Sequence, residues 1–263
     1  MEFGRFLRNE AVTKVEMLAT IAAARRGRRR RARSWRRARR GKAAEGETAL
    51  SLERFLSALC TTRFDDAFNP FADRCAVHDE VEAAKIRAEI MLALLAAAER
   101  RGTRSLWLGR DFGWRGGRRT GLAFTDDAHF SQHLARFDLA ARRPTRGPPM
   151  SERTAAAVWE ALRGADEPFF LWNVFPLHPH PPGAPFSNRA HTAAERAAGE
   201  AILAELIGLL RPERIIAVGR DAESAAARVA PRLERVALRH PSHGGEALFR
   251  AQIAALRGEA ARA

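Results

Sequence analysis

Four short apolar runs, separated by longer segments with helical spacing, constrain the fold of this 263-residue chain most strongly. The apolar runs cover residues 105–109, 169–174, 214–219 and 235–238. The segments with helical spacing are rich in Ala, Leu, Glu and Arg, and they cover 151–163, 192–210, 221–229 and 246–257. Strands that alternate with helices of this length need crossover connections, which give a mainly parallel sheet with helices on both faces. We therefore predict an α/β fold of three layers, αβα, around a mainly parallel four-stranded sheet.

Two further helices are predicted before the first strand, near residues 52–59 and 80–100, with a loop at 70–79 between them. Ligands of open α/β sheets bind outside the carboxyl ends of the strands. Chemically distinctive residues stand at these ends in the sequence, namely Asp111, Asn173, Gly219 and His240. We expect the functional site at this edge of the sheet.

The N-terminal region has a different composition from the rest. Eleven Arg and one Lys, without an acid, lie between Arg25 and Lys42, and this run accounts for most of the formal net charge of +14. Like charges repel and keep a segment unfolded until an anionic partner binds. The run is therefore either a tail that binds DNA, RNA or an acidic membrane surface, or a solvated extension. We predict a disordered basic tail at 1–48 and one folded domain at 49–263.

Cysteine content and apolar patterning restrict cofactors and location. Cys60 and Cys75 are too few for a disulfide framework or a four-thiolate cluster. Glu2, Glu10 and Glu16 interrupt the apolar core that a signal peptide needs, and no run approaches the ~20 apolar residues of a membrane span. We expect a cytoplasmic protein without a membrane partner.

A glycine-rich segment follows the first predicted strand. Residues 109–126 (GRDFGWRGGRRTGLAFTD) combine five glycines with the Asp111 carboxylate. Glycines allow tight turns and close approach of a ligand to backbone N–H groups. The segment lacks the Gly-Lys-Ser/Thr of a Walker A loop, and it does not open a helix as the dinucleotide fingerprint does. It is either an ordinary glycine-rich turn or a site of another kind.

The segment resembles the first motif of the uracil-DNA glycosylases, Gly-Gln-Asp-Pro-Tyr-His followed by Gly-Leu-x-Phe. The residues that match it with the same separations are Gly109, Asp111, Gly121, Leu122 and Phe124. The second family motif begins His-Pro-Ser, and it is matched after the last strand by His240, Pro241 and Ser242, while Asn173 is a third match. Residues 173–189, followed by a helix and then 209–219, also resemble the thermostable iron–sulfur branch. In all, the resemblance covers about residues 104–250.

The resemblance implies a base excision repair enzyme that flips uracil out of DNA and hydrolyses its N-glycosidic bond, leaving an abasic site. This reaction develops positive charge on the sugar and negative charge on the departing base. By resemblance, Asp111 would orient the attacking water and His240 would hydrogen bond to the anion at uracil O2, assisted by backbone N–H groups near Arg110. Asn173 would read O4 and N3, and Phe124 would stack on the flipped base, a contact of about 1–3 kcal/mol.

Departures from the family pattern affect the choice of base. The motif tyrosine, whose ring blocks the methyl group of thymine in the family, is Gly113 here, and the chain has no Tyr. Trp114 or Phe112 is the candidate to fill the space, and Trp114 joins Gly109 in the predicted substrate-binding set. Selectivity for uracil over thymine therefore stays open.

Two other family features are missing. Gly244 and Gly245 stand where the family often has a leucine that wedges into the DNA stack, so the wedge is lost or is supplied by Leu248 or Phe249. The iron–sulfur branch uses four cysteines, and this chain has two, so we predict no cluster.

Positive and polar side chains near the motifs are expected to contact DNA. The predicted set is Arg115, Arg118, Arg119, Arg189, Ser242, His243 and Gly244. His178 and His180 suggest a metal pair, but alternating prolines keep their segment extended and no third ligand is evident, so we predict that they line the DNA groove. We expect a nucleoid-associated monomer that uses neither a metal nor a cofactor.

Three alternatives remain at this stage. A related glycosylase would accept thymine, hypoxanthine or another deaminated base. A protein of another class would bind abasic or damaged DNA with little turnover. A metal-dependent phosphoesterase would use Asp111, Asp126, Asp127 and His240.

Overall fold

The computed structural model describes residues 42–260, with side chains placed for residues 50–258. The helices are α2 (Lys42–Thr61), α3 (Ala83–Arg101), α4 (Gly117–Thr120), α5 (Phe130–Arg136), α6 (Arg153–Ala161), α7 (Ala193–Leu210), α8 (Arg220–Val229) and α9 (Glu246–Ala260). The strands are β1 (Ala67–Phe68), β2 (Ser105–Asp111), β3 (Phe169–Phe175), β4 (His178–Pro179), β5 (Arg214–Val218) and β6 (Glu234–Leu238). The four strands and the helical segments that the sequence predicts are all confirmed.

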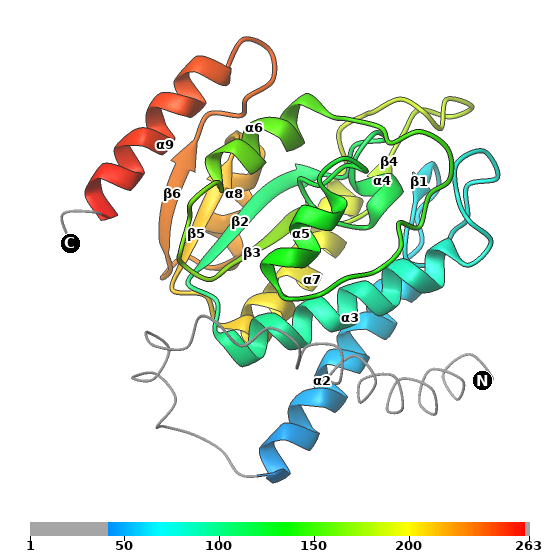
Figure 1. Cartoon of the computed structure of the whole chain (residues 1–263), viewed down its shortest axis with the longest axis horizontal. Coiled ribbons are helices and arrows are strands. Elements are labelled where there is room, and N and C mark those ends of the chain that lie inside the picture. Colours follow the sequence, from blue (N-terminus) through cyan, green and yellow to red (C-terminus); the bar gives the residue numbers. More distant parts are fainter. Residues whose placement is uncertain (1–41, 261–263) are drawn as a thin grey trace.

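Four strands form one parallel sheet in the order β3-β2-β5-β6 (Figure 1). The chain leaves β2 toward β3 through α4, α5 and α6, and it returns past β2 to β5 through α7. The strand order therefore reverses between β2 and β5. In an open α/β sheet such a switch point leaves a crevice at the carboxyl ends of the two strands.

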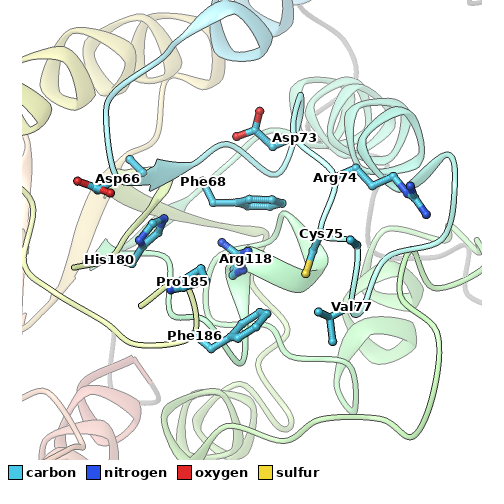
Figure 2. A pocket seen from close by; sticks show the side chains of 12 residues that line it. Asp66, Phe68, Asp73, Arg74, Cys75, Val77, Arg118, His180, Pro185 and Phe186 are labelled. Carbon is cyan, nitrogen blue, oxygen red and sulfur yellow. The ribbon is translucent and has the colours of Figure 1, made fainter. Parts of the chain in front are cut away.

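A second, two-stranded sheet pairs β1 with β4 in antiparallel fashion, with Phe68 opposite His178. It borders a hollow of about 470 Å³. Figure 2 shows Arg118 in the middle of this hollow, between the rings of Phe68 and Phe186. The two strands are too short to give a periodic signal, and the sequence did not predict them.

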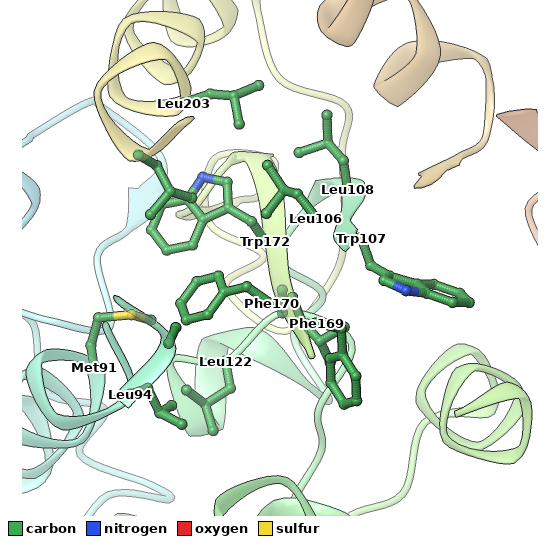
Figure 3. Close-up of a cluster of buried hydrophobic side chains, with 14 of the residues drawn as sticks. Met91, Leu94, Leu106, Trp107, Leu108, Leu122, Phe169, Phe170, Trp172 and Leu203 are labelled. Atoms are coloured by element: carbon green, nitrogen blue, oxygen red, sulfur yellow. The ribbon is translucent and has the colours of Figure 1, made fainter. Parts of the chain in front are cut away.

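The core surrounds the parallel sheet on both faces. Leu106 and Leu108 of β2 point toward Leu203 of α7, whereas Trp107 points to the opposite side (Figure 3). All seven residues of β3 are buried. Such strands read as continuous apolar runs because both faces are covered, which is why the sequence pattern identified them.

Ring contacts show which helices cover which face. Trp159 of α6 meets the ring of Phe169 on one side of β3, and Phe55 of α2 meets Trp172 on the other. Helix α7 begins with a capping box, in which the Thr192 side chain accepts from the Glu195 N–H and the Glu195 side chain accepts from the Thr192 N–H. The predicted αβα layering is confirmed.

The predicted boundary between tail and domain at residue 48 falls inside a helix. Helix α2 begins at Lys42 and continues to Thr61, so part of the expected tail is helical. The arginine-rich run before it lies outside the described residues. Helices α4 and α5 were not predicted, because a single turn and a seven-residue helix are too short to give an apolar period.

Between residues 42 and 260, none of the helices is long and apolar enough to cross a membrane.

Candidate active site

The parallel sheet brings the predicted site residues to one edge. In the register of β2 and β3, Gly109 lies opposite Asn173, with Asp111 at the end of β2. Gly219 follows β5, and a Cβ atom placed on it would lie 3.3 Å from Cβ of His240, which follows β6. The residues from the four strand ends therefore lie along one edge of the sheet, on either side of the point where the strand order reverses.

Asp111 is held by a cation and an imidazole. Its Oδ2 accepts a hydrogen bond from Nε of Arg110 at 2.7 Å, and its Oδ1 is hydrogen bonded to Nδ1 of His191. Arg110 also reaches Oδ2 of Asp221 at 3.3 Å. Because carboxylate oxygens accept, His191 donates from Nδ1. The carboxylate is 5% exposed and has a fixed orientation.

His191 was missed by sequence reasoning. It lies just before helix α7, far along the chain from Asp111, and is separated from it by β3 and β4. No motif or spacing marks it, since its position depends on how the loop before Thr192 folds back over the strand ends.

Asn173 has an unused acceptor. Its Nδ2 donates to the backbone oxygen of Asp111 at 2.9 Å, which fixes the orientation of the amide. Its Oδ1 is buried and has no hydrogen-bond partner among the described residues. An unsatisfied buried acceptor costs about 1–3 kcal/mol, so such an atom calls for a functional explanation.

Phe124 lies against this amide, and Gly109 makes room for both. A Cβ atom on Gly109 would come within 2.6 Å of the Phe124 ring and 2.8 Å of Nδ2 of Asn173. Phe124 has φ of +51°, which is rare for an aromatic residue. Its carbonyl accepts from Nε1 of Trp159 at 3.0 Å, and this bond helps to hold the strained backbone.

The site is closed in this state. Asn173 is 4% exposed and Asp111 is nearly as well covered. The hollow of Figure 2 contains neither of them.

His240 is a neutral imidazole of defined tautomer. Burial lowers its pKa to about 4, and the charges of Arg110, Arg239 and His243 add to this effect. Its Nδ1 accepts from the backbone N–H of Ser242 at 3.2 Å and lies 2.8 Å from the Ser242 hydroxyl. Since Nδ1 accepts, the proton is on Nε2, which is a donor. Ser242 thus orients His240, and its contact with DNA stays a prediction.

Glu152 was not predicted and lies beside the glycine-rich loop. A Cβ atom on Gly113 would lie 3.0 Å from Oε1 of Glu152, so this carboxyl occupies the space into which a side chain at position 113 would point. Burial and, to a smaller extent, the charge of Asp126 raise the pKa of Glu152 to about 7, against the opposing effect of Arg115.

Phe112 and Trp114, which were predicted to fill the space beside Gly113, lie in different places. Phe112 is buried, and its ring lies so close to Gly117 that a Cβ there would collide with it. The prediction that Phe112 fills the space beside Gly113 is therefore wrong. Trp114 faces Phe186, with ring centroids 6.1 Å apart.

Two of the predicted phosphate contacts involve arginines that are almost fully buried, Arg118 and Arg119. Arg118 lies 3.8 Å from the centroid of the Phe68 ring and donates from Nη1 toward Nδ1 of His178 at 3.3 Å. Arg119 forms a buried ion pair with Asp127 at 2.7 Å. Their guanidinium groups hold the glycine-rich loop to the core.

Arg189 also forms its hydrogen bonds within the protein. It donates to both carboxylate oxygens of Glu195, at 2.6 and 2.7 Å, and to the carbonyl of His180 at 3.0 Å. The prediction that it contacts phosphate is not supported by these contacts. Arg115 and His243 are exposed, as is Gly244, and these three stay predicted DNA contacts.

The histidine pair does not line a groove as predicted. His178 is fully buried, and its pKa falls to about 3 through burial first and then through the charge of Arg118. His180 is partly exposed and borders the hollow of Figure 2. No group of three potential metal ligands occurs in the part of the chain that the structure describes.

The carboxylates of the phosphoesterase alternative are structural. Asp126 accepts from the Glu152 N–H at 2.6 Å and from the His129 N–H at 2.9 Å. Asp127 pairs with Arg119 and accepts from the Thr145 hydroxyl at 2.6 Å. Both groups are buried and fully engaged, which leaves neither for a metal ion.

Of the two wedge candidates, only one is exposed. Leu248 on helix α9 is 54% exposed, while Phe249 is fully buried. Leu248 therefore stays a predicted wedge, and Phe249 is excluded.

Comparisons with known proteins bear on the family and on the fold. The family model of the uracil DNA glycosylase superfamily matches residues 100–254. The crystal structure of wild-type Pedobacter heparinus SMUG2 is similar in fold, with a TM-score of 0.53 and 16% sequence identity over 79% of this chain and 97% of that chain. Comparison with curated proteins gives no match.

The fold is a three-layer α/β scaffold with polar residues at the carboxyl ends of its strands. The family match covers more than half of the chain, and the chain belongs to the uracil DNA glycosylase superfamily. By family it is a DNA-repair glycosylase.

Proposed function

We propose that this protein removes uracil from DNA by hydrolysis of the N-glycosidic bond. The observation that carries the proposal is the buried, unpartnered Oδ1 of Asn173 beside Asp111. Uracil presents an N3–H donor, which such an acceptor would satisfy. Cytosine presents a bare nitrogen acceptor at the same position, which would meet Oδ1 with repulsion. The orphan oxygen thus favours a deaminated base over its parent.

Asp111 is suited to the sugar side of the reaction. Its carboxylate is aligned by Arg110 and His191, and it lies on the strand next to Asn173. An aligned carboxylate can accept a proton from the attacking water and stabilise the positive charge on the sugar. A group positioned in advance needs little reorganisation during the reaction.

His240 is suited to the departing base. With a pKa of about 4, it is neutral at physiological pH, and its Nε2–H can donate to an oxygen that gains negative charge. A neutral donor keeps its proton bound throughout, so its role is hydrogen bonding and not proton transfer.

A wider base scope is a second candidate, favoured by the unpartnered Oδ1 of Asn173. Hypoxanthine carries an N–H next to a carbonyl as uracil does, so the same acceptor would bind it. The experiment that tests uracil excision therefore also measures which other bases are excised.

The test uses oligonucleotides that each carry one uracil, cytosine, thymine or hypoxanthine, treated with alkali after incubation. We expect cleavage at uracil and none at cytosine. Asn173→Ala should slow uracil excision by about 10- to 100-fold, because the N3–H is then left unpaired in a buried site. Equal rates on uracil and cytosine, or an unchanged rate in the variant, would contradict the proposal.

A further inference from the structure

Three arginines are almost fully buried in the part of the chain that the structure describes, and one of them has no counter-ion. Arg87 is paired with Asp79, and Arg119 is paired with Asp127. Arg118 is 6% exposed and forms no ion pair with a carboxylate of the described residues. Asp79, whose negative charge also acts on Arg118, is already bound to Arg87. A buried charge without a counter-ion is costly, so Arg118 calls for an anion from outside the chain.

The groups that contact the Arg118 guanidinium are neutral. Its Nη1 donates to Nδ1 of His178 at 3.3 Å, and burial and the charge of Arg118 lower the pKa of this histidine to about 3. The guanidinium carbon lies 3.8 Å from the centroid of the Phe68 ring and 5.4 Å from that of Phe186. Ring faces attract a cation without neutralising it. Nε and Nη2 donate to no nitrogen or oxygen atom of the described residues, so both are free for a ligand.

This guanidinium faces the hollow of about 470 Å³ that β1 and β4 border (Figure 2). Two carboxylates also line the hollow, those of Asp66 and Asp73, and in Figure 2 both point away from Arg118. Asp73 accepts a hydrogen bond from the Asn69 N–H at 2.7 Å. Pockets of about 300–1,000 Å³ hold small molecules. The hollow therefore presents an uncompensated cation to a ligand of that size.

Phe186 presents an aromatic ring at the rim of the same hollow. It is 36% exposed, and Val77, also on the rim, is 57% exposed. The Phe186 ring is held by contacts with the rings of His78 and Trp114, whose centroids lie 5.2 and 6.1 Å away. Sites for unpaired nucleotides combine positive charge for the phosphate with an aromatic ring on which the base stacks. Arg118 and Phe186 supply both elements.

The hollow is attached to the candidate active site but does not belong to it. It contains none of the residues proposed to read the excised base or to act on the sugar. The Arg118 N–H donates to the carbonyl of Gly113 at 3.1 Å, on the loop that leaves β2 at Asp111. The backbone between residues 111 and 118 spans at most about 25 Å. One strand of DNA can therefore reach both positions.

We propose that this hollow is a second nucleotide-binding site, in which Arg118 binds the phosphate and the Phe186 ring stacks on the base of an unpaired nucleotide of the DNA strand under repair. Phosphate supplies the negative charge that Arg118 lacks, and a guanidinium can donate to two of its oxygens at once. The inference goes beyond uracil excision, and it does not depend on which base is excised.

The two contacts have different signatures in the binding of single-stranded DNA. Loss of one phosphate contact should reduce the slope of log affinity against log salt concentration by about 0.7. Loss of one stacked base should weaken binding by about 5- to 150-fold and leave the slope unchanged.

The test measures the affinity of the full-length protein for a labelled single strand without uracil, by fluorescence anisotropy at several salt concentrations. Arg118→Gln should reduce the salt slope by about 0.7. Phe186→Ala should weaken binding at an unchanged slope, and it should not weaken binding to a fully paired duplex. Arg163→Gln changes an exposed arginine just before β3, at the opposite end of the sheet, and Leu50→Ala changes an exposed leucine on α2. Both controls should bind as the unaltered protein does.

Because the probe contains no uracil, the result is independent of excision. An unchanged slope in Arg118→Gln overturns the phosphate contact, and an equal loss on single strand and duplex in Phe186→Ala overturns the stacked base. Thermal unfolding with dTMP or thymidine separates the strand from a free nucleotide. If dTMP alone stabilises the unaltered protein and not Arg118→Gln, while both bind the strand equally, the assignment to the strand is wrong. If Arg118→Gln does not fold, Phe186→Ala decides alone, because Phe186 lies at the surface.

Discussion

The carboxyl ends of β2 and β3 differ from the carboxyl end of β6. At β2 and β3 the polar groups are buried and tied together, with Asn173 bonded to the Asp111 carbonyl and the Asp111 carboxylate bonded to His191. After β6 the chain is open, with His243 and Leu248 exposed. The difference separates a buried, internally bonded region, which we propose reads the base, from an exposed region, which we propose contacts DNA.

His240 joins the two regions, and its loss should lower the rate more than the loss of Ser242 or of Leu248. It lies after β6, yet it is buried, neutral and oriented by Ser242. His240→Ala should lower the single-turnover rate on uracil by about 10²- to 10³-fold, since it removes one preorganised donor to the developing anion. Ser242→Ala keeps the imidazole and should lose much less.

The pH profile sharpens this point. A histidine with a pKa of about 4 does not titrate between pH 5 and 7, so no change in rate near pH 6.5 should depend on His240. If the excision rate of the unaltered protein changes across pH 6.5 and that of His240→Ala does not, the imidazole of His240 titrates in that range. The assignment of a permanently neutral His240 would then be wrong.

Substitution of Leu248 should lower the excision rate by a smaller factor, and only on duplex DNA. A side chain that fills the stack after base flipping matters only where a stack exists. Leu248→Ala should slow excision from duplex by roughly tenfold, in line with the burial energy of one leucine, and leave single-stranded DNA unaffected. Leu50→Ala, at an exposed leucine on α2, is the matched control. Equal loss on both substrates would place Leu248 outside the wedge role.

The sheet, its helices and the strand-end residues were predictable from the sequence, because apolar runs and two short motifs mark them. The burial of Arg118 and Arg119 was not. A glycine-rich loop with arginines suggests an exposed basic surface, but here α4 turns inward and pairs Arg119 with Asp127. The contact of Glu152 with Gly113 joins segments separated by α4 and α5, and no local pattern indicates it.

The same reason explains His191 and the internal role of Arg189. Both lie in the loop between β4 and α7, which folds back over the sheet edge toward Asp111 and Asp66. Their partners come from distant segments, so only the folded chain reveals them. The sequence motifs therefore predict residues such as Asp111, but they do not predict the side chains that orient these residues, such as His191.

We propose above all that Asp111 serves a metal-independent glycosylase. The most direct measurement compares the unaltered protein with Asp111→Asn on an oligonucleotide that carries one uracil, with EDTA present throughout and alkali treatment afterwards. We predict cleavage by the unaltered protein and a loss of about 10²- to 10⁴-fold in the variant, in which the side chain keeps its size and shape but loses its negative charge. Equal cleavage by both, or cleavage abolished by EDTA, would contradict it.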